Sequence, residues 1–246
     1  MVLESFGDRL AVAVVGSTGG IGAALVEALV ASPKVERVHA LSRSGAGHGS
    51  PKVHNLTFDF TDANSIAAGA EAVREAGPLD LVIVATGLLH GEGIEPEKNL
   101  RALSHEAFQT SFLVNATGPA MVAQSFLPLL RRDGKAVFAA LSARVGSISD
   151  NRLGGWYAYR ASKAALNQII RTLSIEWGRK RKSHILLTLH PGTVDTDLSE
   201  PFQGNVPEGK LFTPEFSAEK LLEVIDGATT ADTGTLIDWA GVTVAP

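Results

Sequence analysis

Residues 10–31 read LAVAVVGSTGGIGAALVEALVA and contain the successive parts of one structural unit. The first six residues are a continuous apolar run of strand length, and the last nine have the apolar periodicity of a helix. Between them lie Gly16, Gly20 and Gly22, in the spacing G-x-x-x-G-x-G. Glycines allow a tight turn, and a helix N-terminus offers N–H groups and a positive dipole end to a pyrophosphate. The stretch predicts a strand, a phosphate-binding loop and a helix. The alternative is an ordinary glycine-rich turn.

The rest of the chain continues this alternation of strands and helices. Apolar segments predict strands at 10–15, 37–41, 53–58, 79–85, 136–141, 185–189 and 235–238, and periodic segments predict helices at 21–31, 63–75, 106–130, 156–178 and 217–226. Strands that are apolar throughout are typical of a parallel sheet covered on both faces. We expect one α/β domain over residues 1–246, with a Rossmann-type doubly wound parallel sheet of about seven strands. Ligands of such folds bind beyond the carboxyl ends of the strands.

Composition excludes several classes of protein. The 246 residues are 45% apolar and 20% charged, as in an ordinary globular domain, and the net charge is −4. The basic run RKRK at 179–182 follows a predicted helix and is interpreted as its solvated end, so no nucleic-acid partner is expected. No apolar stretch is long enough to span a bilayer, and the absence of cysteine excludes disulfides, a thiol nucleophile and a cysteine-bound metal. We predict a cytoplasmic protein with no membrane partner and no metal site.

Tyr159 and Lys163 are the strongest candidates for chemistry. They stand four residues apart in the predicted helix 156–178 and therefore share one face of it. A tyrosine with a pKa near 10 is a poor acid or base at neutrality, and a neighbouring cation lowers that pKa. The pair thus predicts proton transfer to or from an alcohol oxygen.

Polar residues and glycines also follow the predicted strands. Ser42 and Arg43 follow the second strand without a carboxylate, which favours a 2′-phosphate and hence NADP(H) over NAD(H). Asp59, after the third strand, either accepts a hydrogen bond from an adenine or belongs to the loop in which Asp62 caps the next helix. The expected cofactor-binding residues are Gly16, Ser17, Thr18, Gly20, Ile21, Gly22, Ser42, Arg43, Asp59, Ala85, Thr86, Gly87, Tyr159, Lys163, Pro191, Gly192, Val194 and Thr196.

Taken together and in order, these motifs resemble the classical short-chain dehydrogenases/reductases over essentially the whole chain. The motifs are the glycine loop, Asn115 in VNATGPA, a serine after the fifth strand, YRASK and PGTVDT. Within the family the chain looks most like the branch of C-factor-like and sniffer-type carbonyl reductases. The resemblance implies an NADP(H)-dependent oxidoreductase that interconverts a carbonyl and an alcohol.

The resemblance also implies a role for each catalytic candidate. Tyr159 would be the general acid or base, and Lys163 would lower its pKa and hold the nicotinamide ribose. Ser142 would hydrogen-bond the substrate oxygen, and Asn115 would support a water chain that relays the proton through Lys163. The family often has two serines after the fifth strand, whereas this chain has Ser142 and Ala143, so Ser147 remains an alternative to Ser142.

A second hypothesis is a protein that has the same fold but little catalytic activity. The family's usual Asn-Asn-Ala-Gly is Val-Ala-Thr-Gly at 84–87, and a nucleotide-binding sensor or signalling protein would tolerate such a change. The presence of Tyr159 favours the enzyme, because a binding module has no need of it.

The remaining expectations concern the substrate and the assembly. Residues 198–212 are rich in proline and glycine and predict a mobile flap with an apolar inner wall over a small-molecule substrate. The histidines at 90, 105 and 184 are interpreted as surface or loop residues. By analogy with the family, a homodimer or homotetramer is expected.

Overall fold

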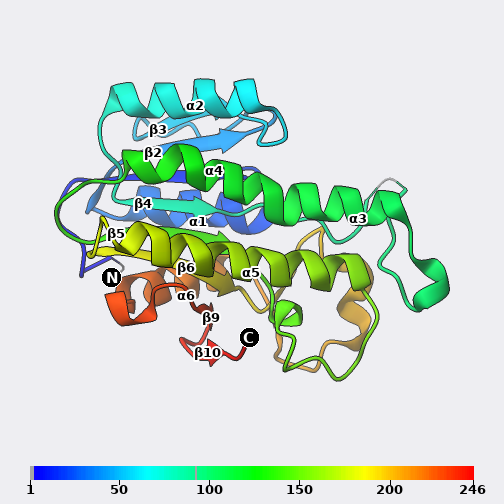
Figure 1. The fold of residues 1–246 in the computed structure, drawn as a ribbon. Coiled ribbons are helices and arrows are strands. Elements are labelled where there is room, and N and C mark those ends of the chain that lie inside the picture. Colours follow the sequence, from blue (N-terminus) through cyan, green and yellow to red (C-terminus); the bar gives the residue numbers. More distant parts are fainter. Residues whose placement is uncertain (1–2, 92) are drawn as a thin grey trace.

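A single sheet forms the middle of the molecule, with helices on both of its faces (Figure 1). The computed structural model describes residues 3–91 and 93–246. The strands of the sheet are β1 (Leu10–Val15), β2 (Val35–Ser42), β3 (Val53–Thr57), β4 (Leu81–Val84), β5 (Ala136–Leu141), β6 (His184–His190), β9 (Leu236–Asp238) and β10 (Thr243–Val244). The α-helices are α1 (Gly20–Ala31), α2 (Ala63–Ala76), α3 (His105–Phe112), α4 (Gly118–Phe126), α5 (Tyr157–Gly178) and α6 (Pro214–Gly227).

The order of the strands fixes where a ligand can bind. Within the described residues the sheet has eight strands in the order β10-β9-β6-β5-β4-β1-β2-β3. Each neighbouring pair is parallel except β9 and β10, which are antiparallel. The chain therefore runs outward from β1 in one direction and from β4 in the other. The gap beyond the carboxyl ends of β1 and β4 is the switch point at which doubly wound folds bind ligands.

The apolar run of β1 is divided between two cores. Leu10, Val12 and Val14 face α1 and α6, whereas the alternate residues Ala11, Ala13 and Val15 face α2, α4 and α5. This alternation follows from the two-residue period of a strand, and it explains why the strand is apolar throughout. The predicted parallel sheet covered on both faces is confirmed, with an eighth, antiparallel strand, β10, added at the edge.

The helix predicted over residues 106–130 is divided by a π-turn. Between α3 and α4 lies η2 (Leu113–Thr117), a π-helix, and α4 is followed by the short 3₁₀-helix η3 (Leu127–Leu129). Pro119, at the start of α4, has no N–H to donate to the carbonyl of Asn115, which is four residues earlier. Helix periodicity alone does not reveal a π-turn, so the prediction of one uninterrupted helix was wrong at this point. Such turns are frequent at functional sites.

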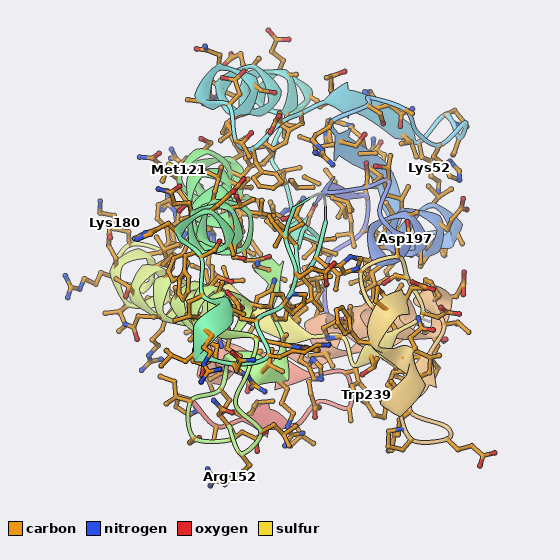
Figure 2. The ribbon with its side chains drawn as sticks, turned by 90° about the vertical axis from the view of Figure 1, so that its right-hand side faces the viewer. Lys52, Met121, Arg152, Lys180, Asp197 and Trp239 are labelled. Atoms are coloured by element: carbon orange, nitrogen blue, oxygen red, sulfur yellow. The ribbon has the colours of Figure 1, made fainter. Side chains whose placement is uncertain are left out.

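Residues 193–212 form a small structure of their own beside the sheet. Strands β7 (Thr193–Val194) and β8 (Leu211–Phe212) pair in parallel, and the 3₁₀-helix η5 (Glu200–Asn205) lies between them. Figure 2 shows this segment at one side of the molecule, between Asp197 and Trp239. Three shorter 3₁₀-helices occur elsewhere in the described residues: η1 (Leu100–Ala102), η4 (Arg144–Gly146) and η6 (Thr230–Asp232).

Candidate active site

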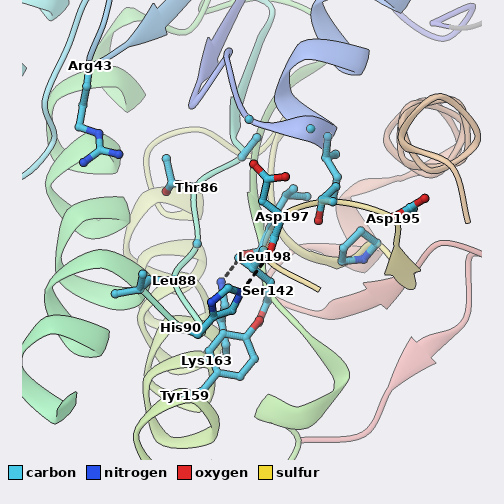
Figure 3. Close-up of a pocket in the computed structure, with 18 residues that line it drawn as sticks. Arg43, Thr86, Leu88, His90, Ser142, Tyr159, Lys163, Asp195, Asp197 and Leu198 are labelled. Carbon is cyan, nitrogen blue, oxygen red and sulfur yellow. Dashed lines mark hydrogen bonds between the residues drawn. The ribbon is translucent and has the colours of Figure 1, made fainter. Parts of the chain in front are cut away.

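A cleft lies beyond the carboxyl ends of the strands, at the switch point. Its central part has a volume of about 620 Å³, within the range of small-molecule sites. The side chains that line this part come from the glycine loop, the ends of β2, β4 and β5, helix α5 and the 193–212 region (Figure 3). It adjoins a second compartment through Arg43 and Thr86, and a more apolar third compartment through Ser142 and Tyr159.

The glycine loop brings the backbone to the floor of the cleft. Gly16 has φ +87°, a conformation that side-chain-bearing residues rarely adopt, and a Cβ on Gly20 would lie 2.5 Å from Thr196 Cγ2. Gly22 lies behind the loop, where a Cβ would collide with the Gly16 carbonyl. The N-terminus of α1 is therefore exposed to the cleft, and its first N–H groups have no partner within the helix.

Two buried hydroxyls in this region lack partners. Ser17 Oγ and Thr86 Oγ1 have no hydrogen-bond partner among the described residues. Buried polar atoms are normally paired, so unpaired atoms beside a cleft indicate room for a polar ligand. With the glycine loop, these atoms fit the pyrophosphate and ribose of a dinucleotide.

Arg43 lies at the cleft, where it borders both the central part and the second compartment (Figure 3). Ser42 and Asp59 line the same compartment. Hydrogen bonds from Thr61 lower the pKa of Asp59, and the nearby charge of Arg43 lowers it further. Asp62 caps α2 by accepting a hydrogen bond from Asn64 N, so the capping prediction for Asp62 is confirmed, and Asp59 itself belongs both to the loop and to the cleft.

Tyr159 and Lys163 are buried side by side on α5. Lys163 Nζ lies 5.8 Å from the centre of the Tyr159 ring and donates a hydrogen bond to the carbonyl of Leu141, at 2.9 Å. Burial lowers the pKa of Lys163 to about 7 and raises the pKa of Tyr159. Removal from water is the cause of the raised Tyr159 pKa, and the lowering of that pKa by Lys163 stays a prediction.

Ser142 joins Tyr159 and Lys163 in lining the cleft. Its hydroxyl donates to Asn167 Oδ1 at 2.7 Å, and the residue borders both the central part and the apolar compartment. Ser147 instead accepts a hydrogen bond from Asp150 N within its own loop and is absent from the described lining. The structure thus brings Ser142, and not Ser147, to the same cavity as Tyr159.

Asn115 lies in the π-turn η2 and supports the wall of the cleft from behind. Its amide accepts from Leu88 N and donates to Leu88 O, both at 2.8 Å, and donates to Ser162 Oγ at 3.1 Å. These bonds join the segment after β4 to helix α5. A Cβ on Gly87 would make ordinary van der Waals contact with Asn115 and Lys163, so these two side chains border the backbone at Gly87.

The apolar compartment has a volume of about 230 Å³ and is bordered by residues 198–206. Phe202 packs at 5.0 Å from the ring of Trp156 and at 5.6 Å from that of His90, and the Trp156 ring also contacts Tyr159. His90 Nε2 donates to the carbonyl of Asp197 at 3.0 Å. These contacts attach the 198–212 segment to the rim of the cleft.

His90 lies in a loop, as predicted, whereas His184 differs from its interpretation as a surface or loop residue. His90 lines the central cavity, and its position soon after the ATG of the fourth strand is the signal that could have indicated this. His184 begins β6, is buried, and accepts a hydrogen bond from Trp177. His105 is exposed at the start of α3, as expected.

The predicted cofactor residues converge on this cleft. Those that line its described compartments are Gly16, Thr18, Gly20, Ile21, Ser42, Arg43, Asp59, Ala85, Thr86, Gly87, Tyr159, Lys163, Pro191, Gly192, Val194 and Thr196. Ser17, within the loop, and Gly22, in α1, are not among the residues that line these compartments.

Comparison with known families identifies the arrangement. The family model described as short chain dehydrogenase matches residues 10–206. The chain belongs to the short-chain dehydrogenase family. This family assignment, made above from the order of the motifs, is confirmed, and with it the activity class of oxidoreductase and the Rossmann-type fold.

Among curated members of the family, the C-signal of Myxococcus xanthus is 37% identical over 134 residues, which cover 54% of this chain and 75% of that protein. The 1-hydroxy-2-glutathionyl-2-methyl-3-butene dehydrogenase of a Rhodococcus species is 31% identical over 72% of this chain and 73% of its own length. A solved structure of NADPH-bound carbonyl reductase from chicken fatty liver superposes with a TM-score of 0.86, at 26% identity, covering 99% of this chain and 97% of that one. The carbonyl reductase Sniffer of D. melanogaster shares the fold, with a TM-score of 0.84 at 22% identity over 97% of this chain and all of its own.

Residues 3–91 and 93–246 also bear on membrane spans and metal sites. No helix there is both long and apolar enough to cross a bilayer. The same residues contain no cluster of three or more histidine or acidic side chains that could hold a metal ion.

Proposed function

We propose that the protein is an NADP(H)-dependent oxidoreductase that interconverts a small carbonyl compound and its alcohol. The observation that carries this proposal is the placement of Ser142, Tyr159 and Lys163 on one wall of a cleft that also contains the glycine loop and Arg43. The similarity to an NADPH-bound carbonyl reductase supports the same activity.

When bound, a nicotinamide cofactor supplies or accepts the hydride. In the proposed mechanism, the Ser142 hydroxyl turns from Asn167 Oδ1, its partner in this structure, and donates its hydrogen bond to the substrate oxygen. Tyr159 gives that oxygen a proton during reduction or takes it during oxidation. Because burial raises the pKa of Tyr159, the phenol carries at neutrality the proton that reduction requires. Lys163, whose pKa is about 7, can pass a proton on at neutrality. Asn115 links Leu88 to α5 by its hydrogen bonds. The water chain that the family resemblance suggests would carry the proton from Lys163 and would begin beside Asn115.

Arg43 supports a preference for NADP(H). A guanidinium can hold a phosphate through two hydrogen bonds, and neither Ser42 nor Arg43 brings a carboxylate that would repel it. Asp59, the nearest acid on this side, is engaged by Thr61.

Three further points belong to the proposal. The apolar lining of the substrate compartment supports an apolar substrate, and the position of residues 198–206 at the border of that compartment supports the role of residues 198–212 as a movable flap. The exposed apolar side chains of Leu113, Met121 and Ile175 support a homodimer or homotetramer. A cytoplasmic location stays a prediction.

A nucleotide-binding sensor is the second candidate. The similarity to a protein named C-signal favours it, as do Val-Ala-Thr-Gly at 84–87 in place of the family's usual Asn-Asn-Ala-Gly, and Ala143 in place of a second serine. This candidate predicts cofactor binding without turnover.

A substrate screen separates the two candidates. Aldehydes, ketones and quinones would be offered with NADPH, and turnover would be followed as loss of nicotinamide absorbance. We expect at least one apolar carbonyl compound to be reduced, and we expect the Tyr159→Phe variant to lose that activity. Cofactor binding without turnover of any compound would favour the sensor.

A further inference from the structure

Helix α5 begins in an unusual way. The three residues before it, Gly154, Gly155 and Trp156, all have positive φ, at +66°, +65° and +51°. Only glycine adopts this region readily, so Trp156 is held there by its surroundings. Its side chain nevertheless contributes to the site, because the indole contacts both Tyr159 and Phe202.

The start of α5 also lacks a cap of its own. The first N–H groups of a helix have no partner within it, and a side chain at the preceding residue usually supplies one. Trp156 occupies that position and makes no such bond within the described structure. The helix that carries Tyr159 and Lys163 therefore depends on another part of the chain for its first turn.

Glu97 supplies the missing partner from sixty-one residues away in sequence. Both oxygens of its carboxylate accept from Ala158 N, at 3.2 and 3.3 Å, and its backbone carbonyl accepts from Trp156 N at 2.6 Å. Glu97 is only 3% exposed, although it lies in the irregular segment between β4 and η1. A Cβ on Gly155 would lie 3.3 Å from the Glu97 carbonyl, so this contact also requires the glycine.

We propose that Glu97 is a positioning residue for catalysis, which fixes the first turn of α5 and thereby the place of Tyr159 in the cleft. A buried carboxylate at the positive end of a 22-residue helix is well placed to do this. Ala158 directly precedes Tyr159, and Trp156 packs against the ring of Tyr159 and against Phe202. Glu97 thus acts on the tyrosine through the backbone and on the wall of the substrate compartment through the indole. The inference rests on the proposed function of Tyr159.

Helix ends fray unless they are held, and a small displacement of a reacting group greatly slows a reaction. Loss of the Glu97 carboxylate should therefore lower kcat by about tenfold or more. The KM for NADPH should change little, because the glycine loop and Arg43 are untouched. A residue that only stabilises the fold would lower the melting temperature and leave the kcat of the folded protein unchanged.

The first test needs neither cofactor nor activity. Amide hydrogen exchange would be measured by mass spectrometry on the wild type, Glu97→Ala, Glu97→Gln and two controls. Glu95→Ala removes an exposed acid from the same segment, and Asp62→Ala removes the cap of another helix, α2. We expect about tenfold faster exchange at the start of α5 in Glu97→Ala only, since opening of the first turn exposes its amides.

The second test measures kcat and KM for the same five proteins. Glu97→Gln keeps an oxygen at the same reach, so it should recover most of the kcat and the protection that Glu97→Ala loses. If Glu97→Ala does not fold, Glu97→Asp replaces it; the shorter side chain pulls the carboxylate back, and effects of the same direction are expected. Unchanged exchange at the start of α5, faster exchange with unchanged kcat, or a Gln variant as poor as Ala would each overturn the inference.

The two proposals fail in different ways. If Tyr159→Phe proves fully active, the proposed function fails while the exchange data still report on the Glu97 contact. If Tyr159→Phe is inactive and the exchange at α5 is unaffected by Glu97→Ala, only the inference about Glu97 fails.

Discussion

At the scale of single residues, burial makes the Tyr159 phenol hold its proton more tightly and the Lys163 ammonium release its proton more readily. The pKa of Tyr159 is raised and that of Lys163 is lowered to about 7 by the same loss of water. The sequence predicts that these two groups lie together, since it fixes their spacing. It does not predict how deeply they are buried, and the direction of each pKa shift depends on that depth.

The role of Tyr159 is tested by Tyr159→Phe, which keeps the ring and removes the proton. We expect kcat to fall by on the order of a hundredfold or more, because a general acid contributes about that much. The dissociation constant for NADPH, measured by isothermal titration calorimetry, should stay close to that of the wild type. A variant that turns over like the wild type would assign Tyr159 to packing alone.

The pKa of Lys163 predicts the pH dependence of the reaction. Below about pH 7 the ammonium is protonated and can replace the proton that Tyr159 gives up, and above it the proton is lost. The kcat for carbonyl reduction should therefore fall as the pH rises through about 7, and the kcat for alcohol oxidation should rise. Initial rates in both directions across this range check the sign. Profiles that are flat through this pH in both directions would contradict it.

The two candidate serines can be separated directly. Ser142 lines the cleft with Tyr159, whereas Ser147 is engaged within its loop. We expect Ser142→Ala to lower kcat/KM by about tenfold or more, as for loss of a hydrogen bond to the reacting oxygen, and Ser147→Ala to have a much smaller effect. A larger loss of kcat/KM in Ser147→Ala than in Ser142→Ala would show that Ser147, and not Ser142, bonds the substrate oxygen.

At the scale of elements, the sequence predicts the strands of the parallel sheet and four of the helices closely, because each has a clear apolar period. It does not predict the π-turn at Leu113–Thr117, where periodicity continues while hydrogen bonding changes. It also places Trp156 inside α5, whereas that residue is left-handed and precedes the helix. The Glu97 contact joins segments far apart in sequence, so no local pattern indicates it.

The end of β2 carries the prediction about cofactor choice. One charge-assisted hydrogen-bonded contact from Arg43 is worth roughly 1.5–3 kcal/mol, which corresponds to about ten- to a hundredfold in affinity. NADPH should therefore bind more tightly than NADH. Ser42→Asp should reverse this order, since a carboxylate there repels a 2′-phosphate and accepts from free ribose hydroxyls. Calorimetric titration at one ionic strength gives the dissociation constants of NADPH and NADH for the wild type and the variant. Equal constants in the wild type would disprove the preference for NADPH.

At the scale of the whole molecule, His39 links stability to pH. Neither ring nitrogen of this buried side chain in β2 has a partner in the described part of the chain, and burial lowers its pKa to about 4, with the charges of His54 and Arg37 adding to the effect. The unfolded chain therefore binds more protons than the folded one between about pH 6.5 and pH 4. Stability is kept above this range and lost as the pH falls through it.

Replacing His39 should make the fold less sensitive to acid. In the His39→Leu variant, the loss of unfolding free energy between neutral pH and pH 4 should be smaller than in the wild type, by up to about 3 kcal/mol. Urea denaturation at several pH values measures this difference. Replacement of the exposed His105 is the matched control, and equal acid sensitivity of wild type and His39→Leu would contradict the prediction.

The aromatic contacts of the 198–212 segment should make tryptophan fluorescence report on the position of that segment. The sequence has three tryptophans; Trp156 packs on Phe202 and Trp239 packs on Phe212, whereas Trp177 donates to His184 at the far end of α5. Two of the three indoles therefore change surroundings whenever this segment opens or closes, and their emission should shift with it. Trp177→Phe would remove most of the constant background. Such a variant would let the opening of the segment be timed in stopped flow without any attached dye.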